Sequence, residues 1–336
     1  MPDLETHTSV PTTKDQDAIA VPVSSSTISG GASSRVDANI SAHVERIDWK
    51  QLLLDYLTLS KPEITFLVTI SALAGFLLGS PNGVDGWTLC WALIGIPLVS
   101  GGGGALNHYL ERTHDRSMRR TSSRPLPAGR IRPESARTFG YVLIAAGLAI
   151  LCPLTNPLTG ILAAISVALY LYVYTPMKRI TSYNTLVGTI PGALPALGGW
   201  TAATGNLDLG GWAIFLILLA WQMPHFLSLA WMYRKDYERA GFRMWTVGDE
   251  TGTRTTRLTL AFTILMIGAS ILPWILNLSG TVYLIGSLIL GAWFMISVTR
   301  FCLSKSVQDA RLVLMGSVKY IPLLLLLIVV DRWISF

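Results

Sequence analysis

Residues 209–232 read LGGWAIFLILLAWQMPHFLSLAWM, an apolar run without a single Asp, Glu, Lys or Arg. A helix that spans a bilayer needs about 20 consecutive, mostly apolar residues, and this run is long enough. The charged stretch RKDYER begins almost at once afterwards, at Arg234. The pattern predicts a transmembrane helix that ends where the charges begin.

Eight further apolar segments have a similar length, and all nine lie roughly at 53–79, 87–107, 136–153, 157–175, 184–203, 209–232, 256–277, 280–300 and 313–333. The whole chain of 336 residues is 51% hydrophobic and only 14% charged, whereas a soluble domain is about a quarter charged. We therefore predict an all-α polytopic membrane protein with about nine transmembrane helices, formed by residues 46–336 as one domain.

Two segments carry further local signals. The third and fourth are separated only by the stretch from Pro153 to Pro157, which predicts a tight hairpin. The fifth holds Gly188, Pro191, Gly192 and Pro195, and we expect it to be irregular and closely packed.

The first residues, 1–45, are rich in Ser, Thr, Ala and Val and show no apolar period. We predict a disordered tail. Several acids lie in it (Asp3, Glu5, Asp15, Asp17 and Asp37), and acidic residues are unusual in mitochondrial presequences. The tail thus favours a bacterial inner membrane over the alternative, the mitochondrial inner membrane.

The net charge of +6 is distributed unevenly between the loops. Lys and Arg gather after the second, fourth, sixth and eighth segments, whereas the loops after the first, third, fifth and seventh have none. Cytoplasmic loops collect Lys and Arg, so with nine spans the N-terminus is predicted to be cytoplasmic and the C-terminus to lie outside.

Asn107, Glu111 and Asp115 follow one another at intervals of four residues, at the end of the second segment. On a helix this spacing forms one stripe that drifts by about 40° per step. Carboxylate and amide oxygens are ligands that Mg²⁺ accepts together with substrate phosphates. The alternative is a solvated helix end carrying Glu–Arg pairs.

A second acidic residue, Asp236, follows the sixth segment on the same predicted membrane face. Fixed cations surround both acidic motifs: Arg119, Arg120, Arg124, Lys178 and Arg179. Carboxylates that hold a metal beside Arg and Lys are what a diphosphate leaving group requires. Topology alone explains most of the cations, and Asp236 has a plainer interpretation as a solvated loop acid.

At this point the motifs resemble a known family. The pattern Asn107-xxx-Glu111-xxx-Asp115, followed by Arg124-Pro-Leu-Pro127, is similar to the signature of the protoheme IX farnesyltransferase (heme O synthase) family, within the UbiA-like intramembrane prenyltransferases. Further blocks in the family's order are YTPMKR from Tyr174, PGALP from Pro191, WQMPHF from Trp221 and DYERAG from Asp236. The resemblance covers about residues 50–330.

The resemblance implies a helical bundle around a cavity open to lipid, and farnesyl transfer from farnesyl diphosphate to the 2-vinyl group of heme b, giving heme O. It implies that Asn107, Glu111, Asp115 and Asp236 hold Mg²⁺ and that Arg120, Arg124, Lys178 and Arg179 bind the diphosphate. Glu238 follows Asp236 by only two residues, so the number of metal ions stays open. Beyond farnesyl diphosphate and heme b, the implied partners are the lipid bilayer and a downstream heme A synthase.

His225 is the ionisable residue within the sixth segment, and such residues usually serve function. If the helix continued from His225 to Asp236, the imidazole would lie roughly 16 Å deeper on the same face. A planar acceptor the size of heme fits that depth, so His225 is our candidate for the acceptor site. The alternative is a neutral core histidine that bonds a backbone carbonyl left free by Pro224.

Two other functions remain compatible with the sequence. A related enzyme would prenylate a quinone precursor such as 4-hydroxybenzoate with the same diphosphate machinery; the WQMPHF block favours the heme branch. A transporter of an anionic lipid or metabolite would more often carry charges at mid-membrane, whereas here they gather at one edge.

Overall fold

The protein is described by a computed structural model over residues 48–335, so the predicted tail lies outside the described residues. Within that range every regular element is a helix, as the apolar segments predicted. In chain order the helices are α2 (Trp49–Leu59), α3 (Pro62–Leu78), α4 (Gly86–Asp115), α5 (Pro133–Leu154), α6 (Pro157–Ala168), the π-helix η2 (Leu169–Tyr174), α7 (Thr175–Ile180), α8 (Asn184–Thr204), α9 (Leu209–Met232), α10 (Arg234–Arg239), α11 (Thr253–Ala269), α12 (Leu272–Ile275), α13 (Thr281–Ser304) and α14 (Val307–Ser335).

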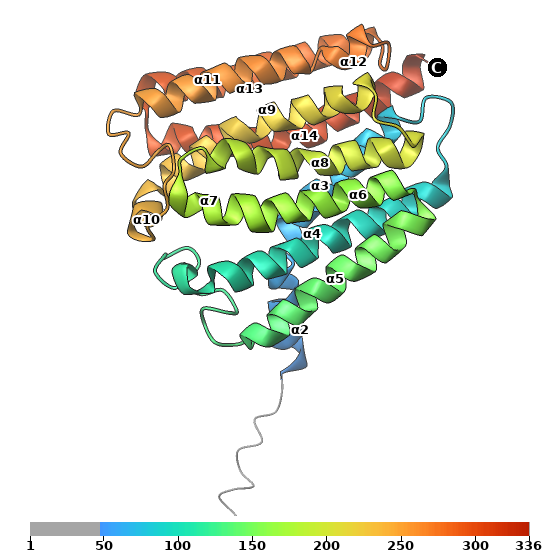
Figure 1. The fold of residues 1–336 in the computed structure, drawn as a ribbon. Helices are drawn as coiled ribbons and strands as arrows, with labels where there is room; N and C mark the ends of the chain where they lie inside the picture. The colour runs from blue at the N-terminus through green and yellow to red at the C-terminus, as the bar shows by residue number, and fades with distance from the viewer. Residues whose placement is uncertain (1–47, 336) are drawn as a thin grey trace, which may run out of the picture. The chain divides into compact units, whose positions relative to one another are not determined.

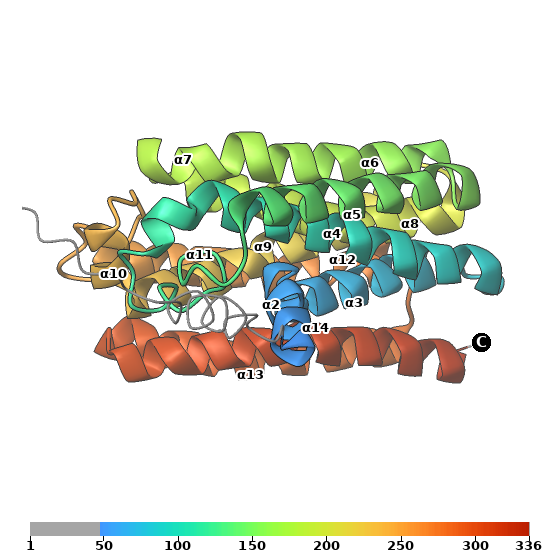
Figure 2. The same ribbon diagram turned by 90° about the horizontal axis from the view of Figure 1, so that it is seen from below.

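The long helices lie side by side, with their connections at two opposite ends (Figures 1 and 2). In the described part of the chain, 7 helices are long and apolar enough to cross a membrane, or 8 if α2 and α3 count as one bent span. Each of the nine predicted segments is helical, although the first is divided between α2 and α3, the fourth between α6 and η2, and the seventh between α11 and α12; α8 is not among the helices that pass the same test. The chain is a multi-pass membrane protein, and the count of nine spans is not confirmed.

Helices α3 and α8 touch backbone to backbone. A methyl group added at Gly75 of α3 would overlap the carbonyl oxygen of Ala196, and one at Gly199 of α8 would overlap that of Ala72. Small residues at such crossings permit the close approach on which helix association in lipid depends. The expected close packing of α8 is confirmed; its expected irregularity is wrong, since α8 is one continuous helix despite Pro191 and Pro195.

The first predicted span is bent, because the chain changes direction between α2 and α3 by 52°. Lys61 occupies the bend with a left-handed backbone (φ 49°), and Pro62 follows as the first residue of α3. A residue before proline is kept out of the helical region, which separates the two helices. The predicted hairpin between α5 and α6 is confirmed, and there Asn156 caps α6 by accepting a hydrogen bond from the Thr159 amide at 2.9 Å.

A break in the helix after α9 changes the predicted position of His225 relative to Asp236. Helix α9 ends at Met232, and Tyr233 (φ −109°, ψ 20°) separates it from α10. The Arg234 guanidinium donates to the Trp231 carbonyl at 3.3 Å and stacks on its indole ring, which satisfies the helix end. The continuous helix assumed between His225 and Asp236 is therefore wrong.

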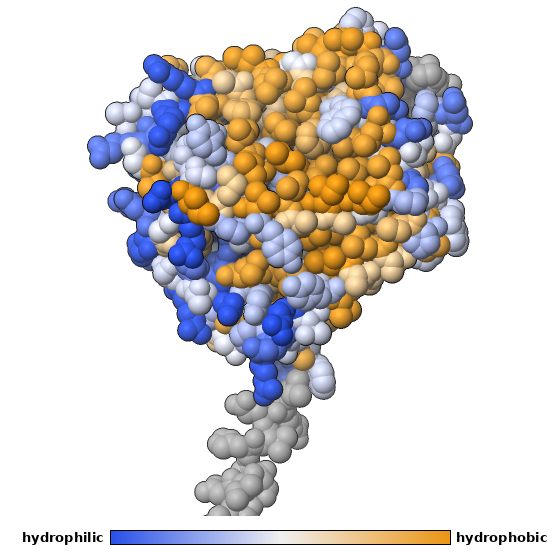
Figure 3. All heavy atoms as spheres, viewed as in Figure 1, coloured by the Kyte–Doolittle hydropathy of each residue, from blue (hydrophilic) through white to orange (hydrophobic). Residues whose placement is uncertain are grey.

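The basic loops converge on one end of the bundle, where they contact one another. The Arg243 amide donates to the Lys178 carbonyl at 2.7 Å, and the Trp231 indole donates to the Lys305 carbonyl at 3.0 Å. In Figure 3 hydrophilic residues gather at the ends of the helices and apolar residues cover the band between them. This surface is what a bilayer-embedded bundle requires.

Candidate functional site

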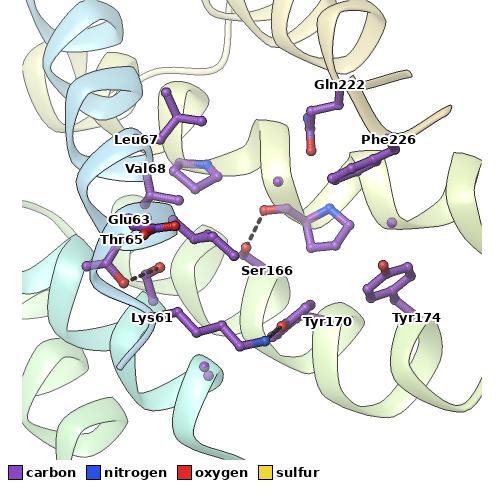
Figure 4. A pocket seen from close by; sticks show the side chains of 18 of the residues that line it. Lys61, Glu63, Thr65, Leu67, Val68, Ser166, Tyr170, Tyr174, Gln222 and Phe226 are labelled. Atoms are coloured by element: carbon purple, nitrogen blue, oxygen red, sulfur yellow. Dashed lines mark hydrogen bonds between the residues drawn. The ribbon is translucent and has the colours of Figure 1, made fainter. Parts of the chain in front are cut away.

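A cavity of about 610 Å³ lies among α3, α4, α6, η2, α8 and α9. Its wall follows α4 from Asp115 to Ile96, a rise of about 28 Å at 1.5 Å per residue. Charged side chains line the end near the basic loops, and residues such as Ile96, Leu162 and Leu194 line the opposite end. Figure 4 shows part of this wall, with Lys61 and Tyr170 joined by a hydrogen bond. The cavity thus has a polar head and an apolar body.

Glu111 and Lys178 face each other across the polar head. Lys178 Nζ lies 2.7 Å from Glu111 Oε1, and their side chains are 12% and 10% exposed. The ammonium also lies 4.6 Å from the centre of the Tyr174 ring. A buried charge requires a partner of opposite sign, and here the predicted metal ligand and the predicted diphosphate ligand supply it to each other.

Asp115 forms a second pair of the same kind. Its Oδ2 accepts from Arg124 at 2.8 Å, and its side chain is 1% exposed. Its Oδ1 is buried and has no hydrogen-bond partner among the described residues. An unsatisfied carboxylate oxygen on a cavity wall is costly unless something binds it, and a hard cation suits it best. Glu111 and Asp115 thus offer carboxylate oxygens that suit a hard cation, although no three His, Cys, Asp or Glu side chains come together as a metal site within residues 48–335.

Asn107 lies behind this wall and is fully buried. Its Oδ1 accepts from Lys61 Nζ at 2.5 Å, and its Nδ2 donates to Thr175 Oγ1 at 3.0 Å. The same ammonium donates to the Tyr170 hydroxyl at 3.0 Å. Asn107 thus joins α3, α4 and α7, and its oxygen already contacts a cation.

The π-helix η2 places two tyrosines on the cavity wall. Pro176 has no amide hydrogen and cannot continue the α-helical ladder, so the preceding turn widens. The Thr175 amide and hydroxyl both bond the Tyr170 carbonyl, the hydroxyl at 2.8 Å. Tyr170 and Tyr174 stack with ring centres 5.8 Å apart, and Lys61 lies over the ring of Tyr170 as Lys178 lies over that of Tyr174.

The other predicted site residues are placed differently. Arg120 lines the cavity and lies 3.5 Å from the Tyr237 hydroxyl. Asp236 is next to Tyr237 but does not line the cavity, and Arg239 pairs with it at 3.3 Å. Arg179 is exposed and also lies off the wall.

His225 lines the cavity from α9. Its Nδ1 lies 2.9 Å from Ser317 Oγ on α14, and its ring packs against Trp221 and Phe226. It bonds a hydroxyl and not the backbone carbonyl that the plainer interpretation required. The acidic motif and His225 therefore share one cavity, although the helix between His225 and Asp236 is interrupted.

Several cavity residues were not predicted from the sequence, among them Lys61, His108 and Tyr237. Lys61 could have been noticed, because it is a charge inside the first apolar segment, where charges usually serve function. His108 is buried, and its Nδ1 has no partner among the described residues. Tyr237 carries no signal beyond its place beside Asp236.

With this geometry established, comparison with known proteins gives the family. The family model described as "UbiA prenyltransferase family" matches residues 68–318. The chain belongs to the UbiA prenyltransferase family. A curated relative from Salinibacter ruber, named protoheme IX farnesyltransferase, is 53% identical over 280 residues, which is 83% of this chain and 99% of that protein.

Solved structures show the same UbiA fold. A structure described as concerning digeranylgeranylglyceryl phosphate synthase in membranes has a TM-score of 0.69 at 20% identity, covering 83% of this chain and 98% of its own. A UbiA homolog from Archaeoglobus fulgidus bound to GPP and Mg²⁺ has a TM-score of 0.60 at 16% identity, covering 82% and 99%. At these identities the likeness concerns the fold alone.

Proposed function

We propose that this protein transfers the farnesyl group of farnesyl diphosphate to the 2-vinyl group of heme b and so forms heme O. The observation that carries the proposal is one cavity that joins paired acids and cations at its polar head to an apolar body and an intramembrane histidine. The 53% identity to a protein named protoheme IX farnesyltransferase supports the choice of substrates. Family membership favours an enzyme over a transporter.

In the proposed complex the diphosphate lies at the polar head. Arg120, Arg124 and Lys178 line that head and supply fixed positive charge to the departing oxygens. Lys61 lies beside them and adds a fourth cation. Arg179 is exposed and contributes to the general positive charge of the cavity mouth.

We assign the metal to the acidic residues, with Glu111 and Asp115 on the wall and Asn107 behind them. The unpartnered Oδ1 of Asp115 supports this assignment most directly. Asp236 stays in the proposed set although it lies off the cavity wall, because its partly exposed pair with Arg239 is worth less than about 1 kcal/mol and yields readily. Bound Mg²⁺ supplies positive charge that stabilises the leaving group.

The proposed reaction proceeds in successive steps within the cavity. The bond between C1 of the farnesyl group and the diphosphate oxygen breaks, and the electron pair leaves with the diphosphate. The vinyl π electrons of heme b form the new carbon–carbon bond, and water adds to the resulting cation and releases a proton. Apolar walls around Leu162 and Leu194 exclude water from the first allylic cation.

We further propose that the chain lies in a bacterial inner membrane with its basic loops in the cytoplasm, where farnesyl diphosphate, a soluble-headed substrate, would enter. The deciding experiment supplies purified protein with heme b, farnesyl diphosphate and Mg²⁺, and measures heme O by mass. Parallel reactions contain a chelator, or 4-hydroxybenzoate in place of heme b. Prenylated 4-hydroxybenzoate without heme O would contradict the proposal.

A further inference from the structure

Ser317 on α14 is fully buried and contacts two residues of α9. Its hydroxyl donates to the Leu314 carbonyl at 2.6 Å and lies 2.9 Å from His225 Nδ1. Its backbone carbonyl accepts from the Trp221 indole at 2.8 Å. One residue of α14 thus holds both aromatic rings of α9 that stack beside the cavity.

This arrangement favours one nitrogen of His225 as the carrier of the ring proton. A serine hydroxyl has one hydrogen, and the Leu314 carbonyl, 2.6 Å away, can only accept it. Both contacts of the Ser317 oxygen are hydrogen bonds at the same time only if Nδ1 of His225 carries the proton and donates to that oxygen. In a neutral imidazole the other nitrogen, Nε2, is left with a lone pair.

The His225 ring forms its hydrogen bond through Nδ1, and no donor to Nε2 is found among the described residues. His225 lines the cavity, whereas Ser317 does not, so the Nδ1 edge faces away from the cavity and towards α14. Rotation of the ring is restricted by Trp221, at 5.4 Å between ring centres, and by Phe226, at 5.7 Å. The imidazole is therefore held so that its basic nitrogen, Nε2, is available to a ligand in the cavity.

We propose that Ser317 is a positioning residue for the heme substrate, because it fixes the His225 tautomer in which Nε2 binds the iron as an axial ligand. Histidines that bind metals almost always donate their other ring N–H to an acceptor, which sets the tautomer and makes the ligand more basic. The inference rests on the proposed function, since it takes heme b as the acceptor. The bond from Nε2 to iron fixes the depth of the porphyrin, and with it the place of the vinyl group relative to the polar head.

The test measures iron ligation apart from turnover. Full-length protein in lipid nanodiscs is titrated with ferric heme b, and the absorption and resonance Raman spectra are recorded for wild type, Ser317→Ala and Ser317→Thr. We expect a histidine-ligated spectrum in wild type and in Ser317→Thr, which keeps the hydroxyl. In Ser317→Ala we expect the dissociation constant for heme to rise about 10- to 100-fold, with a weakened iron–imidazole band.

Two controls separate ligation from packing. Iron-free protoporphyrin IX has the same shape without the metal, so its affinity should be the same in wild type and Ser317→Ala. In His225→Gly, added imidazole should restore the ligated spectrum, and it should do so equally when Ser317→Ala is also present. Free imidazole can bind the iron through either nitrogen, so its binding does not depend on a hydrogen bond to Ser317.

The outcomes distinguish this inference from the function on which it rests. If wild type converts heme b to heme O but Ser317→Ala keeps the wild-type iron spectrum and affinity, the positioning role is wrong and the function stands. Equal loss of affinity for heme and for iron-free porphyrin would reduce Ser317 to a packing residue. If wild type neither binds heme nor makes heme O, the proposed function itself fails.

Discussion

The ammonium of Lys178 lies 2.7 Å from the carboxylate of Glu111, although 67 positions separate the two residues in the chain. This pair joins α4 to α7 and brings a proposed metal ligand into contact with a proposed diphosphate ligand. In the proposed complex Glu111 would exchange Lys178 for Mg²⁺, and Lys178 would exchange Glu111 for the diphosphate. Each of the two buried side chains would then keep a partner of opposite charge.

Removing one member of this pair should destabilise the fold as well as stop catalysis. In Lys178→Met the Glu111 carboxylate stays buried without its counter-ion, and we expect a loss of roughly 3 kcal/mol in the free energy of unfolding. Thermal unfolding in detergent measures the loss. The double variant Glu111→Gln/Lys178→Met removes both charges, so it should regain most of the stability and remain inactive. A double variant as unstable as Lys178→Met would contradict the pairing.

The role of Asp236 as a metal ligand can be tested by comparing it with Glu238, which lies on the same helix, α10. Asp236→Asn should abolish Mg²⁺-dependent turnover, because it removes a proposed metal ligand, as should Asp115→Asn on the cavity wall. Glu238→Gln is the matched control, since Glu238 is exposed on the same short helix. Rates are compared over a Mg²⁺ titration in protein that remains folded. Normal turnover of Asp236→Asn at saturating Mg²⁺ would show that Asp236 is a solvated surface acid and not a metal ligand.

Much of the arrangement follows from sequence because lipid restricts the choices. Apolar segments of spanning length must be helices, and the spacing of Asn107, Glu111 and Asp115 fixes their common stripe once α4 is known to continue to Asp115. Pro62 is a local signal for the bend at Lys61, but local sequence could not reveal that the Lys61 ammonium reaches Asn107 across 46 positions. Nor could it reveal the interruption at Tyr233, which brings Tyr237 and not Asp236 to the cavity wall.

His225 should matter for heme and not for the diphosphate. We expect His225→Ala to raise the heme requirement or stop heme conversion, because it removes the proposed ligand of the acceptor. Mg²⁺-dependent binding of farnesyl diphosphate at the polar head should stay close to wild type. Binding of each substrate is measured separately by equilibrium titration. Unchanged heme affinity and turnover in a stable His225→Ala protein would contradict a role for His225 in the acceptor site.

The apolar end of the cavity should limit the length of the prenyl chain. A methyl group at Gly198 would meet only the Ile96 side chain, at 3.7 Å, which is ordinary contact. Gly198→Ala should therefore keep farnesyl transfer, whereas Gly198→Leu fills the apolar end. We expect Gly198→Leu to favour geranyl diphosphate over farnesyl diphosphate in competition assays read by mass. An unchanged preference would place the prenyl chain elsewhere in the cavity.

The proposed orientation can be read directly with fused reporters. Fusions near residues 125, 178, 245 and 306 should report the cytoplasm, because they lie in the basic loops. Fusions near residues 83, 155, 206 and 279 should report the opposite side. A robust inversion at one of the basic loops would separate the acidic motifs and remove the single-sided site.

The polarity of α8 has a consequence for how the protein is made. Its length would span a bilayer, but its glycines, prolines and threonines make it less apolar than the helices that qualify as spans by themselves. Most of its residues are buried against neighbours, above all at the crossing where Gly75 meets Ala196. A nascent α8 would therefore gain little from lipid when it leaves the ribosome, and would settle in the membrane only after α3 offers it a protein surface. The cavity wall that α8 forms with Gly192 and Gly198 would therefore be completed only when α8 packs against α3 during membrane insertion.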